Sequence, residues 1–123
     1  LLVAPPRSGS TIMFQYLSMA LNCVYTSNWH TLFPSAGSKL LRRKTQRITR
    51  NYYGYTPTMS DVSEANDMFS YILKDSDSEK IKERFWRRVD YMNDGSPVLL
   101  MKNVSSYDKI QLLADSIPEL KFM

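Results

Sequence analysis

The feature that most constrains the fold is a junction near the beginning of the sequence, where an apolar run, a glycine-containing break and a helical pattern follow one another. Leu1–Ala4 is a short apolar run that suits a buried strand, and Pro5–Ser10 is rich in turn formers. From Thr11 onward, apolar residues at helical spacing predict one shared face: Ile12, Met13, Tyr16, Leu17 and Ala20. A strand, a glycine loop and a helix in this order are typical of the opening of an α/β unit.

The last third of the sequence repeats this alternation. Asp94–Pro97 is a turn, and Val98–Met101 has the composition of a second buried strand. A helix is expected over about 105–116, and Pro118 ends it. Leu120–Met123 then begins a third strand. Strands separated by helices predict an α/β fold with a parallel sheet.

The middle of the chain is less regular. We expect a loop over residues 22–38, a basic helix over 39–50 and an irregular, tyrosine-rich segment over 51–60. Asp61 or Ser63 is expected to cap the next helix. Its apolar side would be Ala65, Met68, Phe69, Ile72 and Leu73. After a polar break over 74–78, a further helix would place four apolar residues on one side: Ile81, Phe85, Val89 and Met92.

Composition limits the classes of function. One cysteine, Cys23, excludes an internal disulfide and a cysteine-cluster metal site, and with one histidine we expect no bound metal. No apolar run approaches the roughly 18 residues of a membrane span, so no membrane segment is expected. The sequence starts in one strand-like run and stops in another. We therefore expect residues 1–123 to be part of a single domain that is truncated at both ends.

Pro6–Thr11 has the composition of an anion-binding loop. The first N–H groups of a helix lack internal partners, and the helix dipole places partial positive charge there. Gly9 lets the backbone approach a ligand, Ser10 and Thr11 add hydroxyl donors, and Arg7 adds a planar cation suited to phosphate or sulfate. The alternative is a polar turn that only caps the helix.

The loop lacks the Walker A pattern, because no lysine follows Gly9 and no glycine stands at the required place before it. This absence disfavours an ATPase or a GTPase.

The residues from Leu2 to Thr11 resemble the 5′-phosphosulfate-binding loop of sulfotransferases that use the nucleotide donor PAPS. The resemblance is to the branch with Pro-Arg-Ser-Gly-Ser/Thr-Thr, which includes bacterial enzymes and the tyrosylprotein sulfotransferases. A second segment, Val98–Asn103, followed by a helix and by Ile117–Met123, resembles the family's strand that ends in Lys-Asn/Asp-Pro and the elements after it. The intervening Ser27–Pro34 and Tyr53–Glu64 are also similar to members of this branch.

The resemblance implies a P-loop NTPase-like, three-layer fold and transfer of a sulfuryl group from PAPS to a hydroxyl or amine, which leaves PAP. It also assigns the donor site to Pro6, Arg7, Ser8, Gly9, Ser10 and Thr11. Lys102 would stabilise or protonate the bridging oxygen of the donor, and no metal would be needed. The family's 3′-phosphate site would lie beyond Met123.

The chain departs from the family pattern in two places. Val104 replaces the proline that usually follows Lys-Asn/Asp, which affects the turn more than the chemistry. No carboxylate stands near Asn28 and Trp29, where tyrosylprotein sulfotransferases place a catalytic glutamate. A general base is still required, and His30 and Glu64 remain as alternatives. Each also has a structural interpretation, His30 as a loop histidine and Glu64 as a charge near a helix start.

The partner is expected to be a small-molecule, glycan or peptide acceptor. The basic residues between Lys39 and Arg50 form either a solvated helix face or a docking strip for an acidic acceptor. Two competing hypotheses are a P-loop-like kinase or phosphotransferase and a basic nucleic-acid-binding module. Neither explains the segment around Lys102, so no nucleic acid is expected. The compartment stays open: cytoplasmic for a bacterial protein, or the Golgi lumen for a eukaryotic one.

Overall fold

Short parallel strands form the centre of the fold. The computed structural model describes residues 1–5, 8–32, 62–93 and 95–123. The strands are β1 (Leu2–Val3), β2 (Cys23–Tyr25), β3 (Val98–Leu100) and β4 (Lys102–Asn103). The helices are α1 (Ser10–Ala20), α2 (Asn28–Leu32), α3 (Asn66–Ile72), α4 (Ser78–Met92) and α5 (Ile110–Ser116), with a 3-10 turn, η2 (Tyr107–Lys109), before α5. The predicted α/β class is confirmed.

The strands pair in parallel, and neighbours in space are not consecutive in the sequence. β1 pairs in parallel with β4, and β2 pairs in parallel with β3. Only Met101 separates β3 from β4, so residues 98–103 are one extended segment with β2 on one side and β1 on the other. Backbone hydrogen bonds place residues 121–123 along the free side of β1, with Met123 N–H donating to Leu1 O at 3.0 Å. The spatial order is therefore β2, the 98–103 segment, β1 and 121–123.

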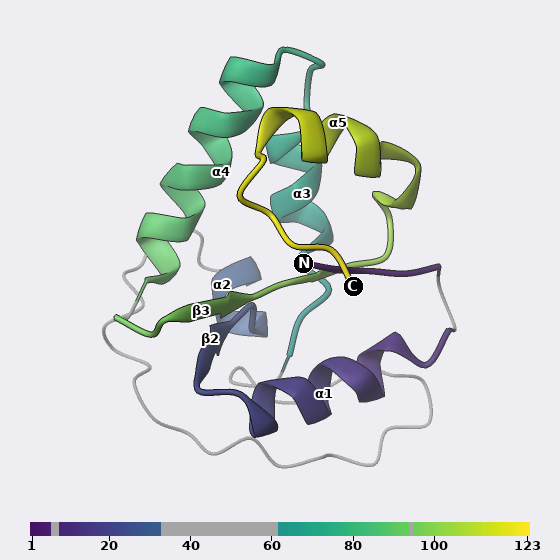
Figure 1. The fold of residues 1–123 in the computed structure, drawn as a ribbon, viewed down its shortest axis with the longest axis vertical. Coiled ribbons are helices and arrows are strands. Elements are labelled where there is room, and N and C mark those ends of the chain that lie inside the picture. Colours follow the sequence, from purple (N-terminus) through teal and green to yellow (C-terminus); the bar gives the residue numbers. More distant parts are fainter. Residues whose placement is uncertain (6–7, 33–61, 94) are drawn as a thin grey trace.

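Helices cover both faces of these strands. In Figure 1, α1 lies on one side of the strands, and α3, α4 and α5 lie on the other. Because successive side chains of a strand point to opposite faces, this arrangement should bury alternate residues on opposite sides. Leu2 and Leu100 join the apolar cluster on the α1 side, whereas Leu1 and Met101 join the one on the α3–α5 side. The strands are thus buried from both faces, as expected of a parallel sheet.

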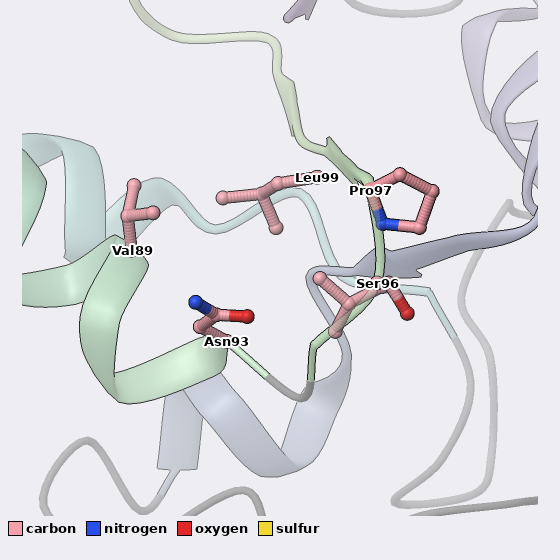
Figure 2. A pocket seen from close by; sticks show the side chains of 6 residues that line it. Val89, Asn93, Ser96, Pro97 and Leu99 are labelled. Carbon is pink, nitrogen blue, oxygen red and sulfur yellow. The ribbon is translucent and has the colours of Figure 1, made fainter.

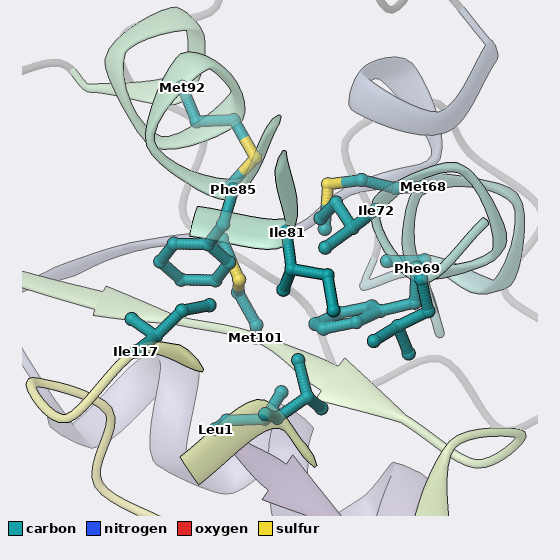
Figure 3. Packing of buried hydrophobic residues seen from close by; sticks show 12 residues of the cluster. Leu1, Met68, Phe69, Ile72, Ile81, Phe85, Met92, Met101 and Ile117 are labelled. Carbon is teal, nitrogen blue, oxygen red and sulfur yellow. The ribbon is translucent and has the colours of Figure 1, made fainter. Parts of the chain in front are cut away.

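The two apolar clusters differ in size. The larger one lies between the strands and α3, α4 and α5, and Figure 3 shows its side chains interdigitating. Phe69, Ile72 and Ile81 are fully buried in it. The smaller cluster on the α1 side consists of Leu2, Phe14, Val62 and Leu100. The predicted apolar sides of the two middle helices are confirmed, since their residues belong to the large cluster or pack against it.

Of the predicted apolar face of the first helix, Leu17 packs against the smaller cluster, but most of the face is wrong. The helix itself is present as α1, but Ile12, Met13 and Tyr16 are each more than half exposed. The buried residues of α1 are instead Ser10, Phe14, Gln15 and Ser18, and the Ser18 hydroxyl donates to Gln15 O at 2.8 Å. Phe14 belongs to the smaller cluster. Tertiary packing thus overrides the apolar periodicity of this helix.

Other boundaries also shift. The loop predicted over 22–38 contains β2 and α2. Its part over 33–38 lies outside the described residues, as do the predicted segments over 39–50 and 51–60. The N-cap of α3 is Ala65 and not Ser63, while Asp61 is outside the described part. The last predicted helix begins as the 3-10 turn η2. Of the predicted strand over 120–123, residues 121–123 are hydrogen-bonded along β1, but no strand is assigned there.

Within the described residues, no helix is both long and apolar enough to cross a membrane.

Candidate functional site

Lys102 is a buried lysine in β4, at the edge of the sheet where the parallel strands end. Its side chain is 1% exposed, although a lysine is almost never fully buried without a partner. Strand alternation explains its direction. Met101 points to the α3–α5 side, so the next residue points to the α1 side, with Leu100 and Leu2. The sequence therefore places an ammonium group between the strand end and the beginning of α1.

Two oxygens satisfy this ammonium group. Lys102 Nζ donates to Thr11 Oγ1 at 2.6 Å and to Glu64 Oε1 at 2.7 Å. Thr11 lies in the first turn of α1, 91 residues away in the sequence, and Glu64 lies 38 residues away. A lysine ammonium carries three donors, and the described residues supply acceptors for two. Among the described residues, no acceptor meets the third donor.

The beginning of α1 is shaped by glycine. Gly9 is the N-cap residue and has φ 77°. This left-handed conformation is disfavoured for residues that carry a Cβ atom, so it favours glycine. Its carbonyl accepts from Ile12 N–H at 3.1 Å and Met13 N–H at 3.3 Å. The first turn of α1 contains no acidic residue. Its positive end is therefore not neutralised within the helix, and the Lys102–Glu64 ion pair lies beside it.

Glu64 reaches this place because residues 62–65 cross the carboxyl end of the sheet. Val62 belongs to the cluster on the α1 side and Ala65 to the cluster on the other side. Ser63 N–H donates to Thr26 O at 2.9 Å, just beyond β2. The segment thus passes over the ends of the strands, and the Glu64 carboxylate meets Lys102 there.

Asn103 holds the segment 62–65 in place through hydrogen bonds. The sequence analysis assigned it no role. It is fully buried, and its Nδ2 donates to Glu64 O at 3.2 Å and to Asn66 Oδ1 at 3.1 Å. Its Oδ1 accepts from Ser105 N–H at 3.0 Å. A polar amide directly after Lys102 at a strand end is the one sequence signal that could have found it.

The remaining predicted site residues are distributed as follows. Pro6 and Arg7 lie outside the described residues. Ser8 and Gly9 are exposed, whereas Ser10 is buried at the first position of α1. The structure therefore brings Thr11, Glu64 and Lys102 into direct contact and sets the described part of the loop beside them.

His30 is buried on α2, where the sequence suggested a loop. Its Nδ1 accepts the Ser27 backbone N–H at 3.2 Å and lies 2.8 Å from the Ser27 hydroxyl. Its ring meets the edge of Tyr91, with centroids 6.2 Å apart, and burial raises the pKa of the Tyr91 phenol. These contacts fit a residue that ties α2 to α4.

The topology favours ligand binding at this edge. The chain leaves β1 toward one side of the sheet, through α1 to β2, and leaves β4 toward the other side, through α5 to residues 121–123. In open α/β sheets, ligands bind outside the carboxyl ends of strands where successive connections diverge in this way. Lys102, Thr11 and Glu64 occupy that position, between β1 and β4.

A hollow of about 160 Å³ lies at the opposite, amino end of β3 (Figure 2). Its lining side chains carry no charge: Val24, Val89, Asn93, Ser96, Pro97 and Leu99. A hollow without ionisable groups offers no acid, base or charged ligand contact. The chemistry therefore points to the carboxyl edge rather than to this hollow.

Within the described residues, no group of three or more His, Cys, Asp or Glu side chains could hold a metal ion.

The comparisons with known proteins assign the chain to no family. No protein-family model, no curated protein and no solved structure matches the chain.

Proposed function

We propose that this chain is part of a PAPS-dependent sulfotransferase, in which the beginning of α1 holds the 5′-phosphosulfate and Lys102 assists the transfer. One observation carries the proposal: a lysine that is 1% exposed donates from a strand end to Thr11 at the beginning of α1. A buried ammonium is costly unless it is paired. Glu64 provides that pairing, and the helix start beside the pair has no side-chain cap, a position that favours an anion.

The chemistry of sulfuryl transfer uses these groups directly. Negative charge develops on the bridging oxygen as its bond to sulfur breaks, and a cation fixed beforehand stabilises that charge. The third N–H of Lys102 is available for this oxygen. Backbone N–H groups of residues 8–11 would hold the phosphosulfate, and Arg7, by the family resemblance, would add a second cation. The acceptor supplies a hydroxyl or an amine.

The finer fold assignment is part of the same proposal. We assign a P-loop NTPase-like, three-layer fold because parallel strands are covered by helices on both faces and a glycine-started helix follows β1. The missing Walker lysine separates the loop from ATPases and GTPases. The cation that serves the phosphate chain would come from Lys102, on a neighbouring strand, instead of from the loop.

Calorimetric titration with PAP and, separately, with Mg-ATP tests the donor site in the protein expressed with its natural ends. We expect PAP to bind without metal and Arg7→Ala to weaken it about 10- to 100-fold, as for a lost charged hydrogen bond. Arg87→Ala is the matched control, because Arg87 is an exposed arginine paired with Glu83 on α4. It should change the affinity for PAP less than about twofold.

Three results would overturn the proposal. Preference for Mg-ATP over PAP would indicate a phosphotransferase at the same site. Equal loss of affinity in Arg7→Ala and Arg87→Ala would indicate nonspecific attraction to positive charge, which would also weaken steeply with salt. The absence of any nucleotide binding would exclude a donor site.

A further inference from the structure

The Glu64 carboxylate lies between the buried ammonium of Lys102 and solvent. Lys102 is 1% exposed and Glu64 is 39% exposed, so the pair presents its acidic partner outward. An acceptor molecule arriving from solvent would meet the carboxylate first. We infer that Glu64 is the general base that takes the proton from the acceptor, an inference that rests on the proposed sulfotransferase function.

The two oxygens of this carboxylate have different surroundings. Oε1 accepts from Lys102 Nζ at 2.7 Å. For Oε2, the described residues supply no hydrogen-bond donor. One oxygen is therefore anchored to the cation that serves the donor, and the other is available to the hydroxyl or amine of the acceptor. A base must lie within hydrogen-bond reach of the proton it removes, and this orientation provides that reach.

The backbone around Glu64 is fixed on both sides. Its carbonyl oxygen accepts from Asn103 Nδ2 at 3.2 Å, and the preceding Ser63 N–H donates to Thr26 O. Ala65 follows with φ 52° at 1% exposure, a left-handed conformation that costs a residue with a side chain about 1–2 kcal/mol. Such strain persists only where surrounding contacts enforce it. The carboxylate is thus carried by a rigid support rather than by a free loop.

The same ion pair links the base to the donor. The phosphosulfate brings negative charge to the ammonium that already holds Glu64, and two anions that share one cation repel each other. Lys102 would therefore contact the base on one side and the leaving group of the donor on the other, which places the two reacting molecules next to each other.

The step balances as follows. The proton of the acceptor hydroxyl moves to Glu64 Oε2 while the acceptor oxygen forms a bond to the donor sulfur. The bond between sulfur and the bridging oxygen breaks, and its electron pair stays on the 5′-phosphate of PAP, beside the Lys102 ammonium. Glu64 then releases its proton to solvent, and the site returns to the Lys102–Glu64 pair.

The substitution Glu64→Gln distinguishes two roles for Glu64, a general base and a counter-ion of Lys102. A glutamine amide oxygen can still accept from Lys102 but cannot take up a proton at neutral pH. We expect PAP affinity to change less than about threefold and the single-turnover rate of transfer to fall about 10²- to 10⁴-fold, the usual contribution of a general base. Glu119→Gln, an exposed carboxylate after α5, is the matched control and should leave both values unchanged.

A second variant guards against misfolding of the first. Glu64→Ala should be slow in transfer, and added formate or acetate should restore part of the rate, since a small carboxylate can act as the base in the vacated space. Transfer by Glu64→Gln at near the wild-type rate would overturn the inference and leave Glu64 as a counter-ion. So would loss of PAP affinity in parallel with rate, or no rescue by carboxylates. If the unsubstituted protein does not bind PAP, the proposed function fails together with this inference.

Discussion

The beginnings of α1 and α4 solve the same physical problem in opposite ways. Asp77 caps α4, and its carboxylate accepts from the N–H groups of Glu79 at 3.1 Å and Lys80 at 3.3 Å. Gly9 begins α1 without any side-chain cap, and Thr11 in its first turn accepts from the ammonium of Lys102, which is also paired with Glu64. One helix start is capped by an anionic side chain, whereas the other has no side-chain cap and lies beside the Lys102–Glu64 ion pair.

This difference indicates that the start of α4 serves the stability of the fold and that the start of α1 serves binding. An acidic side chain at a helix start is the stabilising choice, because it satisfies N–H groups and complements the helix dipole. α4 follows this rule and also has Glu79 in its first turn, whereas α1 has no acidic residue there. The uncapped start of α1 instead lies beside the Lys102–Glu64 ion pair, in which the ammonium is buried and the carboxylate is partly exposed. If this start binds an anionic donor, substitutions there should change PAP binding or transfer, whereas substitutions at the start of α4 should change stability alone.

The largest expected effect is on transfer in Lys102→Met. Methionine can fill the buried volume without charge, and the partner Glu64 retains access to solvent. We therefore expect a folded protein whose single-turnover sulfuryl transfer from PAPS is about 10²- to 10³-fold slower, because the charge on the leaving oxygen loses its cation. Lys109→Met, an exposed lysine on η2, is the control. A Lys102→Met rate within about threefold of the wild type would show that the uncapped start of α1 does not use this cation.

The next largest effect is on stability in Thr11→Val. This change removes the hydroxyl that accepts from the buried ammonium, and a hydrogen bond to a charged group contributes about 1.5–3 kcal/mol. Thr31→Val is the matched control, since the Thr31 hydroxyl makes a neutral bond of 2.7 Å to Ser63 Oγ, for which about 0.5–1.5 kcal/mol is expected. Urea unfolding measures both. Equal losses would mean that Lys102 gains no special stabilisation at the start of α1.

A smaller effect is expected for Gly9→Ala. Both Gly9 and Gly95 have positive φ, and a Cβ at either position would meet no atom within 4 Å. Each alanine variant should therefore lose about 1–2 kcal/mol of unfolding free energy from backbone strain alone. Only Gly9→Ala should also weaken PAP binding, because the loop at α1 must approach the donor closely. Equal PAP affinity in the two variants would contradict a donor site at this helix start.

Local patterns were sufficient for the elements whose sequence and packing agree. The apolar spacing of α3 and α4 predicts their buried sides because those helices pack against the sheet through one continuous stripe. The apolar spacing of α1 misplaces most of its buried side, since Gln15 and Ser18 are buried while Met13 and Tyr16 are more than half exposed. β2 and α2 were missed because their neighbourhood is rich in turn-forming residues and each element is short.

The candidate site could be foreseen as separate parts but not as an arrangement. Thr11, Glu64 and Lys102 were each identified from local sequence and family resemblance. Their contact depends on which face Lys102 takes in its strand and on residues 62–65 crossing the sheet end. Both are properties of tertiary packing over separations of 38 and 91 residues, which no local pattern encodes. Asn103 was overlooked for the same reason, since its partners lie on another segment.

The smallest expected effect is a loss of stability at low pH, through the Asp77 cap at the start of α4. The N–H of Lys80 donates to the Asp77 carboxylate, and this bond holds the pKa of Asp77 below its ordinary value of about 3.9. A carboxyl whose pKa is lower in the folded state stabilises the fold above its ordinary pKa, and this stabilisation is lost as the pH falls through the folded value. Urea midpoints should thus decrease below about pH 4, and less so in Asp77→Asn, because asparagine caps without titrating. Asp77→Ala should lower the midpoint already at pH 7 while PAP affinity stays unchanged. A loss of PAP affinity in Asp77→Ala would mean that the two helix starts are not independent, and the division between a stabilising start and a binding start would fail.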